Sequence, residues 1–257
     1  MRRVLDPRPA DVATAAPFAD AVNIPFDELP SRTYELPPRE VVLRVAGPGD
    51  LVGQVVGWLE AHGRAGVVTP DVPLADPAST PAVGRLWRPH AFLEEVVAQL
   101  EPGRALDLAC GCGREAAFLA GCGWDVTAID ILPDALARGR DLARRYTPNS
   151  PPIRWLAADL ERDPPAFECE FDLITGFRYL HRPLFARFAD WLRPGGCVVW
   201  ETFTTTHRAR HGRPTRDEHV LQVGELPRLL AGFERVHASE EWRGPAHTAR
   251  VWGRVAP

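Results

Sequence analysis

Glycines and carboxylates recur at successive turns in the C-terminal two-thirds of the chain. Gly111 and Gly113 follow Asp107 closely, and Asp130 and Asp159 come later. Glycines allow a tight turn and a close approach of the backbone to a ligand. A carboxylate about 20 residues beyond such a turn can accept hydrogen bonds from ribose hydroxyls. Asp159 would be placed to receive an adenine amino proton, so the spacing predicts a nucleotide-type ligand.

The elements that must position these residues alternate between strand and helix patterns. We expect mostly parallel strands with helices on both faces, and an antiparallel pair at the end. The expected strands are 104–110, 124–130, 153–159, 171–176, 197–203, 234–241 and 248–255, and the expected helices are 114–120, 133–146, 184–192 and 225–230. The fold class is therefore α/β, with a Rossmann-like, doubly wound, mostly parallel seven-stranded sheet whose last strand is antiparallel.

Five motifs in this order resemble those of class I S-adenosylmethionine-dependent methyltransferases. They are residues 107–113, Asp130, Asp159, the Phe-Asp-Leu-Ile run at 171–174 and the Leu-Arg-Pro-Gly-Gly run at 192–196. The resemblance covers roughly residues 84–256 and implies S-adenosylmethionine as the cofactor. It assigns cofactor contacts to Asp107, Ala109, Cys110, Gly111, Gly113, Asp130, Ile131, Asp159, Leu160 and Phe177. Ala109 departs from the family motif, which often has glycine there, and we expect only a small adjustment.

Within that class, the runs at 86–89, 178–182, 201–204 and 224–226 are similar to those of tellurite-resistance-type methyltransferases. The similarity implies a small-molecule methyl acceptor, such as a soft thiol or chalcogen. It leaves open whether a general base is used, since a soft acceptor needs no strong base. Arg88 is a further candidate for contact with the cofactor's carboxylate.

Three polar residues near the ends of the fourth and fifth expected strands are candidates for the catalytic side. Arg178 could hold an anionic acceptor, because a guanidinium forms bidentate bonds to such groups. His181 could take a proton at neutral pH. Glu201 leaves the fifth strand and is either a pocket carboxylate or a paired structural one. The basic run 207–213 is either a solvated loop or a lid over an anionic substrate.

Composition excludes several kinds of function. A formal net charge of -4 leaves no broad basic field, so nucleic acid is not an expected partner. The chain contains no lysine, which excludes a P-loop and a pyridoxal Schiff base. The five cysteines do not follow a zinc spacing, and no metal is expected. With no long apolar stretch and no signal-like N-terminus, we expect a soluble, cytoplasmic protein without a membrane partner.

The N-terminal residues resemble a rhodanese domain. The resemblance rests on residues 4–8, 21–25, 27–29 and 36–39, and it places the active-site loop at 46–51. The catalytic cysteine of the family falls on Ala46, and no cysteine precedes Cys110. Persulfide transfer needs a thiolate, so this domain is expected to be a scaffold, a homodimer surface or a module for a protein partner. The expected division is a rhodanese-like domain at 1–69, a proline-rich linker at 70–83 and the methyltransferase domain at 84–257.

Two other functions remain open from the sequence alone. Gly111, Gly113, Ala116 and Asp130 would also fit an NAD(P)-dependent oxidoreductase, against which Asp159 and the Pro-Gly-Gly turn argue. A non-enzymatic binding or regulatory protein made of two decayed domains is the second alternative.

Overall fold

The computed structural model of the chain describes residues 4–69, 71–76, 84–167 and 171–256. The chain divides into two compact units, Met1–Arg88 and Pro89–Pro257. The second unit therefore begins five residues later than the predicted start at residue 84. Of the predicted linker, residues 70 and 77–83 lie outside the described part of the chain. In the described part, Ala19 and Ala75 form backbone hydrogen bonds that join residues 71–76 to the first unit.

The first unit is a small α/β layer. Its parallel sheet has the strand order β2-β1-β3-β4. The strands are β1 (Val4–Asp6), β2 (Ala21–Asn23), β3 (Leu43–Val45) and β4 (Gly66–Val68), and the helices are α1 (Ala10–Ala15), the single 3-10 turn η1 (Thr33–Glu35) and α2 (Gly49–Ala61). The core of this unit is aliphatic and includes Leu5, Val45 and Leu59, all of which are buried.

The second unit is built on a seven-stranded sheet with the order β10-β11-β9-β8-β5-β6-β7. The strands are β5 (Arg104–Leu108), β6 (Asp125–Asp130), β7 (Arg154–Ala157), β8 (Phe171–Phe177), β9 (Leu192–Phe203), β10 (Glu234–Arg243) and β11 (Ala246–Arg254). All neighbours from β7 to β9 pair in parallel, whereas β11 runs antiparallel to both β9 and β10. The mostly parallel sheet with an antiparallel last strand is confirmed.

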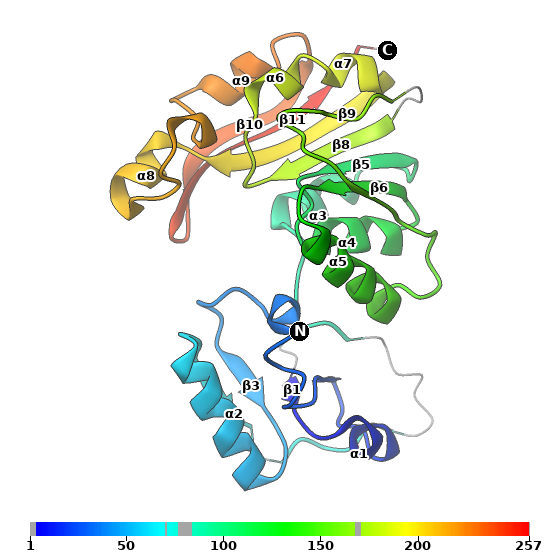
Figure 1. Cartoon of the computed structure of the whole chain (residues 1–257), viewed down its shortest axis with the longest axis vertical. Coiled ribbons are helices and arrows are strands. Elements are labelled where there is room, and N and C mark those ends of the chain that lie inside the picture. Colours follow the sequence, from blue (N-terminus) through cyan, green and yellow to red (C-terminus); the bar gives the residue numbers. More distant parts are fainter. Residues whose placement is uncertain (1–3, 70, 77–83, 168–170, 257) are drawn as a thin grey trace. The chain divides into compact units, whose positions relative to one another are not determined.

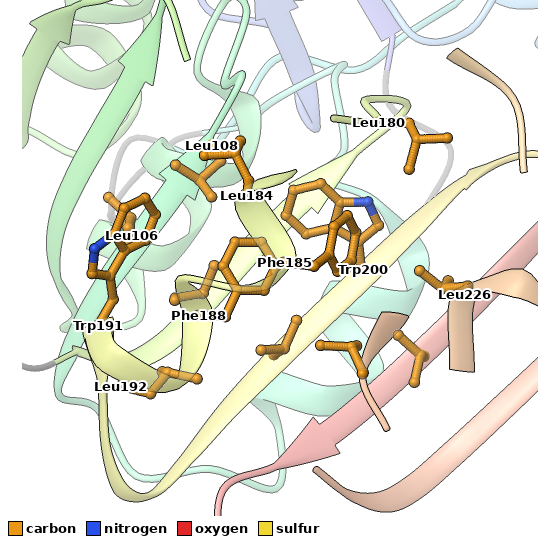
Figure 2. Packing of buried hydrophobic residues seen from close by; sticks show 14 of the residues in the cluster. Leu106, Leu108, Leu180, Leu184, Phe185, Phe188, Trp191, Leu192, Trp200 and Leu226 are labelled. Carbon is orange, nitrogen blue, oxygen red and sulfur yellow. The ribbon is translucent and has the colours of Figure 1, made fainter. Parts of the chain in front are cut away.

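Helices cover both faces of this sheet (Figure 1). They are α3 (Ala91–Val97), α4 (Arg114–Gly121), α5 (Pro133–Tyr146), α6 (Arg182–Phe185), α7 (Phe188–Trp191), α8 (Thr205–His211), the 3-10 turn η2 (Asp217–His219) and α9 (Glu225–Leu229). Helices α3, α4 and α5 pack on one face through one cluster of buried residues. Helices α6, α7 and α9 pack on the other through an aromatic cluster around Phe185, Phe188 and Trp200 (Figure 2).

Local sequence signals explain where most of these elements begin and end. Helix α5 covers the predicted range 133–146. Pro133 fits the first turn of a helix, and the buried residues of α5 recur at helical spacing. The predicted helix 184–192 is instead two short helices, α6 and α7. Leu192 pairs with Phe171 and therefore belongs to β9. Among the described residues, no helix combines the length and the apolarity that crossing a bilayer requires.

Candidate active site

The turn from β5 to α4 is shaped by left-handed backbone conformations. Ala109, Gly111 and Gly113 have φ of 54°, 53° and 68°. The Cys110 backbone N–H donates to the Ile129 carbonyl at 2.9 Å, which ties the turn to β6. Glycine adopts these angles without penalty, while a side chain such as that of Ala109 costs roughly 1–2 kcal/mol. The departure from glycine at Ala109 thus leaves the turn intact.

The two glycines of the turn have different structural roles. A Cβ at Gly113 would lie 2.4 Å from the ring of Trp155, so this glycine lets α4 approach β7 closely. Gly139 of α5 is in the same position, with a Cβ 2.6 Å from that ring. A Cβ at Gly111 would meet nothing within 4 Å. Gly113 serves packing, whereas Gly111 borders open space above the sheet edge.

Two carboxylates lie beside this open space. Asp130, at the end of β6, accepts backbone hydrogen bonds from Gly111 (2.8 Å) and Leu132 (2.9 Å). Asp107 is buried, and its Oδ2 has no hydrogen-bond partner among the described residues. Burial raises the pKa of Asp107, and the negative charge of Glu115 adds to the effect. An orphaned acceptor oxygen and a carboxylate on the turn are suited to a ligand that carries hydroxyls or positive charge.

The other predicted cofactor residues differ in their exposure. Ile131 is 57% exposed, and it could cover a flat apolar group. Asp159 follows β7, and its Oδ1 accepts hydrogen bonds from the backbone of Glu161 and Arg162. Cys110 and Leu160 are buried, and each side chain packs in a hydrophobic cluster. For these two residues only the backbone could reach a ligand.

The residues predicted for the acceptor side begin where β8 ends. Phe177 and Glu201 are register partners on β8 and β9, so their side chains point to the same face of the sheet. The Arg178 N–H donates to the Glu201 carbonyl at 2.9 Å. Arg178 is exposed, and its φ of 58° is unusual for a residue other than glycine. Backbone strain of this kind is found most often at functional sites.

The Glu201 carboxylate is surrounded by residues of the last two strands. Its side chain is 4% exposed, and its Oε1 accepts a hydrogen bond from Thr248 Oγ1 at 2.5 Å. Arg243 Nη1 lies 4.0 Å from the same oxygen, and Arg250 is the register partner of Glu201 on β11. Burial raises the pKa of Glu201, while Thr248 and the arginines oppose the rise.

His90 is the residue of this site that the sequence did not reveal. Its ring stacks on Phe177, with centroids 4.3 Å apart and an interplanar angle of 13°. Its Nδ1 lies 3.8 Å from Glu201 Oε2. Burial lowers the pKa of His90 to about 4, and the positive charges of Arg178, Arg250 and Arg243 contribute. His90 directly follows the run 86–89 and precedes α3, but no spacing in the sequence links it to Phe177 or Glu201.

Three other candidates take no part in these contacts. His181 is the residue before α6, and no described contact joins its side chain to Arg178 or Glu201. The basic run 207–213 includes most of α8, where Arg208 pairs with Asp217 at 2.5 Å. Arg88 ends the first unit and is exposed. The described residues contain no group of three or more metal-binding side chains.

Comparisons with known proteins agree with this geometry. A methyltransferase domain family matches residues 105–196. A demethylmenaquinone methyltransferase from Beutenbergia cavernae is 38% identical over 128 residues, which is 47% of this chain and 48% of that protein. An uncharacterized protein from Schizosaccharomyces pombe is 24% identical over 89% of this chain and 85% of its own length.

Two solved structures share the fold of the second unit. TehB from Haemophilus influenzae has a TM-score of 0.54 and 18% identity, over 65% of this chain and 62% of that chain. The N-methyltransferase NodS from Bradyrhizobium japonicum WM9, solved with S-adenosyl-l-homocysteine, has a TM-score of 0.52 and 20% identity, over 65% and 84%. The chain therefore carries a methyltransferase domain at residues 105–196, and S-adenosylmethionine is its cofactor.

Proposed function

We propose that the enzyme transfers the methyl group to a small anionic acceptor of the soft thiol or chalcogen class, held by Arg178. The observation that carries the proposal is the free guanidinium of Arg178. Among the described residues its side chain has no hydrogen-bond or ion-pair partner, yet its backbone is fixed to Glu201 in a left-handed conformation. A charged group held on a constrained backbone without a partner is suited to a ligand of opposite charge.

The residues of the β5–α4 turn fit the cofactor. Gly111 leaves the backbone open to a close approach, and Asp130 offers a carboxylate for ribose hydroxyls. When bound, the cofactor supplies an electrophilic methyl group on a positively charged sulfur. Arg178 would hold the acceptor within about 3–3.5 Å of that group, and His90 and Phe177 would line the space between them.

The charge of the acceptor can be tested with three small thiols that differ in charge, each rate being compared with its uncatalysed rate. Thioglycolate is anionic, 2-mercaptoethanol is neutral and cysteamine is cationic, and release of S-adenosylhomocysteine reports turnover of each. We expect thioglycolate to have the highest kcat/KM and Arg178→Gln to lower it at least about 10-fold, since a charged hydrogen bond contributes ~1.5–3 kcal/mol. Arg187→Gln, an exposed arginine between α6 and α7, is the matched control. Equal turnover of the three thiols, unaffected by Arg178→Gln, would contradict the proposal.

We also propose that the first unit is a rhodanese-like domain that acts as a scaffold or a homodimer surface. The loop that follows β3 begins at Ala46, which is 2% exposed, and leads into α2. No thiol is available in this unit, because the first cysteine of the chain is Cys110. The full chain should therefore form no thiocyanate from thiosulfate and cyanide. Measurable turnover would contradict this assignment, and sedimentation of the full chain would test the dimer.

We propose a reducing, cytoplasmic location for the protein. Cys110, Cys112 and Cys197 are free cysteines among the described residues. Free thiols persist where glutathione and thioredoxin keep them reduced. Localisation of the tagged full chain by microscopy tests this, and export from the cytoplasm would contradict it.

A further inference from the structure

Two buried polar atoms face each other on the acceptor side without a hydrogen-bond partner. They are His90 Nδ1 and Glu201 Oε2, and they lie 3.8 Å apart. Leaving buried polar atoms unpaired is unfavourable, so these two call for an explanation. A small rotation of either side chain would bring them into hydrogen-bond distance. The imidazole would then donate from Nδ1 to the carboxylate.

Both side chains are held in place from outside the pair. The His90 backbone N–H donates to Glu115 Oε1 at 3.1 Å, and its ring lies flat on Phe177. Glu201 is fixed through Oε1 by Thr248 Oγ1 at 2.5 Å. His90 Nε2 has no partner among the described residues, and it is not one of their buried unpaired atoms. It is therefore accessible.

We propose that His90 is a catalytic general base of the methyl transfer, and that Glu201 is the positioning residue that orients its imidazole through Nδ1–H. This inference rests on the proposed function and extends it to acceptors that carry a proton on the attacked atom. The acceptor's lone pair forms the new bond to the methyl carbon, and the electron pair of the broken carbon–sulfur bond stays on the cofactor's sulfur. The acceptor's proton passes to His90 Nε2 and then to solvent, so the step is balanced.

The charges around His90 keep its imidazole neutral but make it a weaker base in the free enzyme. The charged groups around the imidazole are Glu95 from α3, Arg178 after β8, Glu201 from β9, Arg243 from β10 and Arg250 from β11. Glu115 from α4 accepts from the His90 backbone N–H. Burial and the three arginines keep its pKa low, so at neutral pH the imidazole is uncharged with a free lone pair. An anionic acceptor on Arg178 would offset part of the positive charge. The pKa of His90 would then rise when such an acceptor binds, which strengthens the base.

The first test is the tautomer of His90, read from long-range nitrogen–proton spectra of the full chain labelled on histidine. His90→Gln assigns its signals. We expect a neutral Nδ1–H imidazole at pH 7 in the wild type, and a loss of that preference in Glu201→Leu, because the acceptor of the Nδ1 proton is gone. A neutral Nε2–H tautomer in the wild type would overturn the proposal. The tautomer can be measured without an acceptor, so this test of His90 applies even if no thiol is methylated.

The second test is turnover of thioglycolate as a function of pH. We expect His90→Gln to lower kcat by about 100-fold, the usual contribution of a general base, with KM little changed. Its remaining activity should rise about 10-fold per pH unit, because only thiolate already present in solution can react. Glu201→Gln should lower kcat less, and His62→Gln in the first unit should have no effect. Titration with S-adenosylhomocysteine shows whether each variant still binds the cofactor.

The possible failures can be told apart. If no thiol is methylated by the wild type although S-adenosylhomocysteine binds, the acceptor class of the proposed function is wrong. If thioglycolate is methylated and His90→Gln keeps the rate and the pH profile of the wild type, the base assignment is wrong.

Discussion

The two halves of the active-site edge are built in different ways. The cofactor half, from β5 to β7, depends on backbone conformations at one turn and on carboxylates that follow strands. The acceptor half, from β8 to β11, depends on side chains that come from distant parts of the chain and meet on one face of the sheet. In the proposed function, local geometry therefore places the cofactor, and long-range packing shapes the site for the acceptor.

Replacing Asp130 would disrupt the cofactor half most strongly. Asp130→Ala removes a carboxylate suited to two charged hydrogen bonds with ribose hydroxyls, each contributing ~1.5–3 kcal/mol. We expect a loss of about 4 kcal/mol, or roughly 1000-fold in affinity for S-adenosylhomocysteine by calorimetry. Asp125→Ala, an exposed residue at the start of the same strand, should bind normally. Unchanged affinity in Asp130→Ala would show that the ligand lies elsewhere.

Substituting the two glycines of the turn separates packing from binding. Gly113→Ala forces a Cβ into the Trp155 ring at a left-handed φ. We therefore expect the free energy of unfolding to fall by about 3 kcal/mol. Gly111→Ala has no clash within the protein, so it should lose only about 1 kcal/mol of stability but bind the cofactor more weakly. Chemical denaturation and calorimetry measure the two effects. Equal stability of the two variants would mean that the Trp155 side chain moves to accommodate the added Cβ.

Acid should weaken the acceptor half through His90. The pKa of His90 is about 4 in the folded chain, below the ordinary 6.5, so the unfolded chain binds the proton first as pH falls. The contribution of the neutral imidazole to the free energy of unfolding is complete above pH 6.5 and is lost as pH falls towards about 4. Between pH 7.5 and 5 the wild type should lose about 2 kcal/mol more stability than His90→Gln. Urea titrations at both values test this, and parallel losses would exclude a buried neutral imidazole.

The smallest expected effect comes from the segment that follows α8. Arg182 Nε donates a hydrogen bond to Glu225 Oε1 at 2.5 Å. The same guanidinium donates to the backbone carbonyls of Glu218 and Val220, each at 2.9 Å. Because these groups are partly exposed, Arg182→Met should cost only about 1 kcal/mol of stability. A double-mutant cycle with Glu225→Gln isolates the pair. A coupling energy near zero would show that the pair does not hold the segment to α6.

The difference between the halves also explains how far the sequence could be interpreted. Asp107, Gly111, Gly113 and Asp130 form a local pattern, and strand–helix alternation predicted the sheet around them. His90 could not be found in this way, because it contacts Phe177 and Glu201 only after α3 packs on the sheet. Thr248, Arg243 and Arg250 were missed for the same reason. The antiparallel register of β10 and β11 brings them to Glu201, and no local spacing encodes that register.

The most direct test of the account is calorimetric titration of the full chain with S-adenosylhomocysteine, with NADH as the control. The account predicts saturable binding of S-adenosylhomocysteine at one site per chain and no heat of binding from NADH. Binding of NADH in its place would contradict the account, because the open space beside Gly111 and Asp130 would then belong to a dinucleotide enzyme.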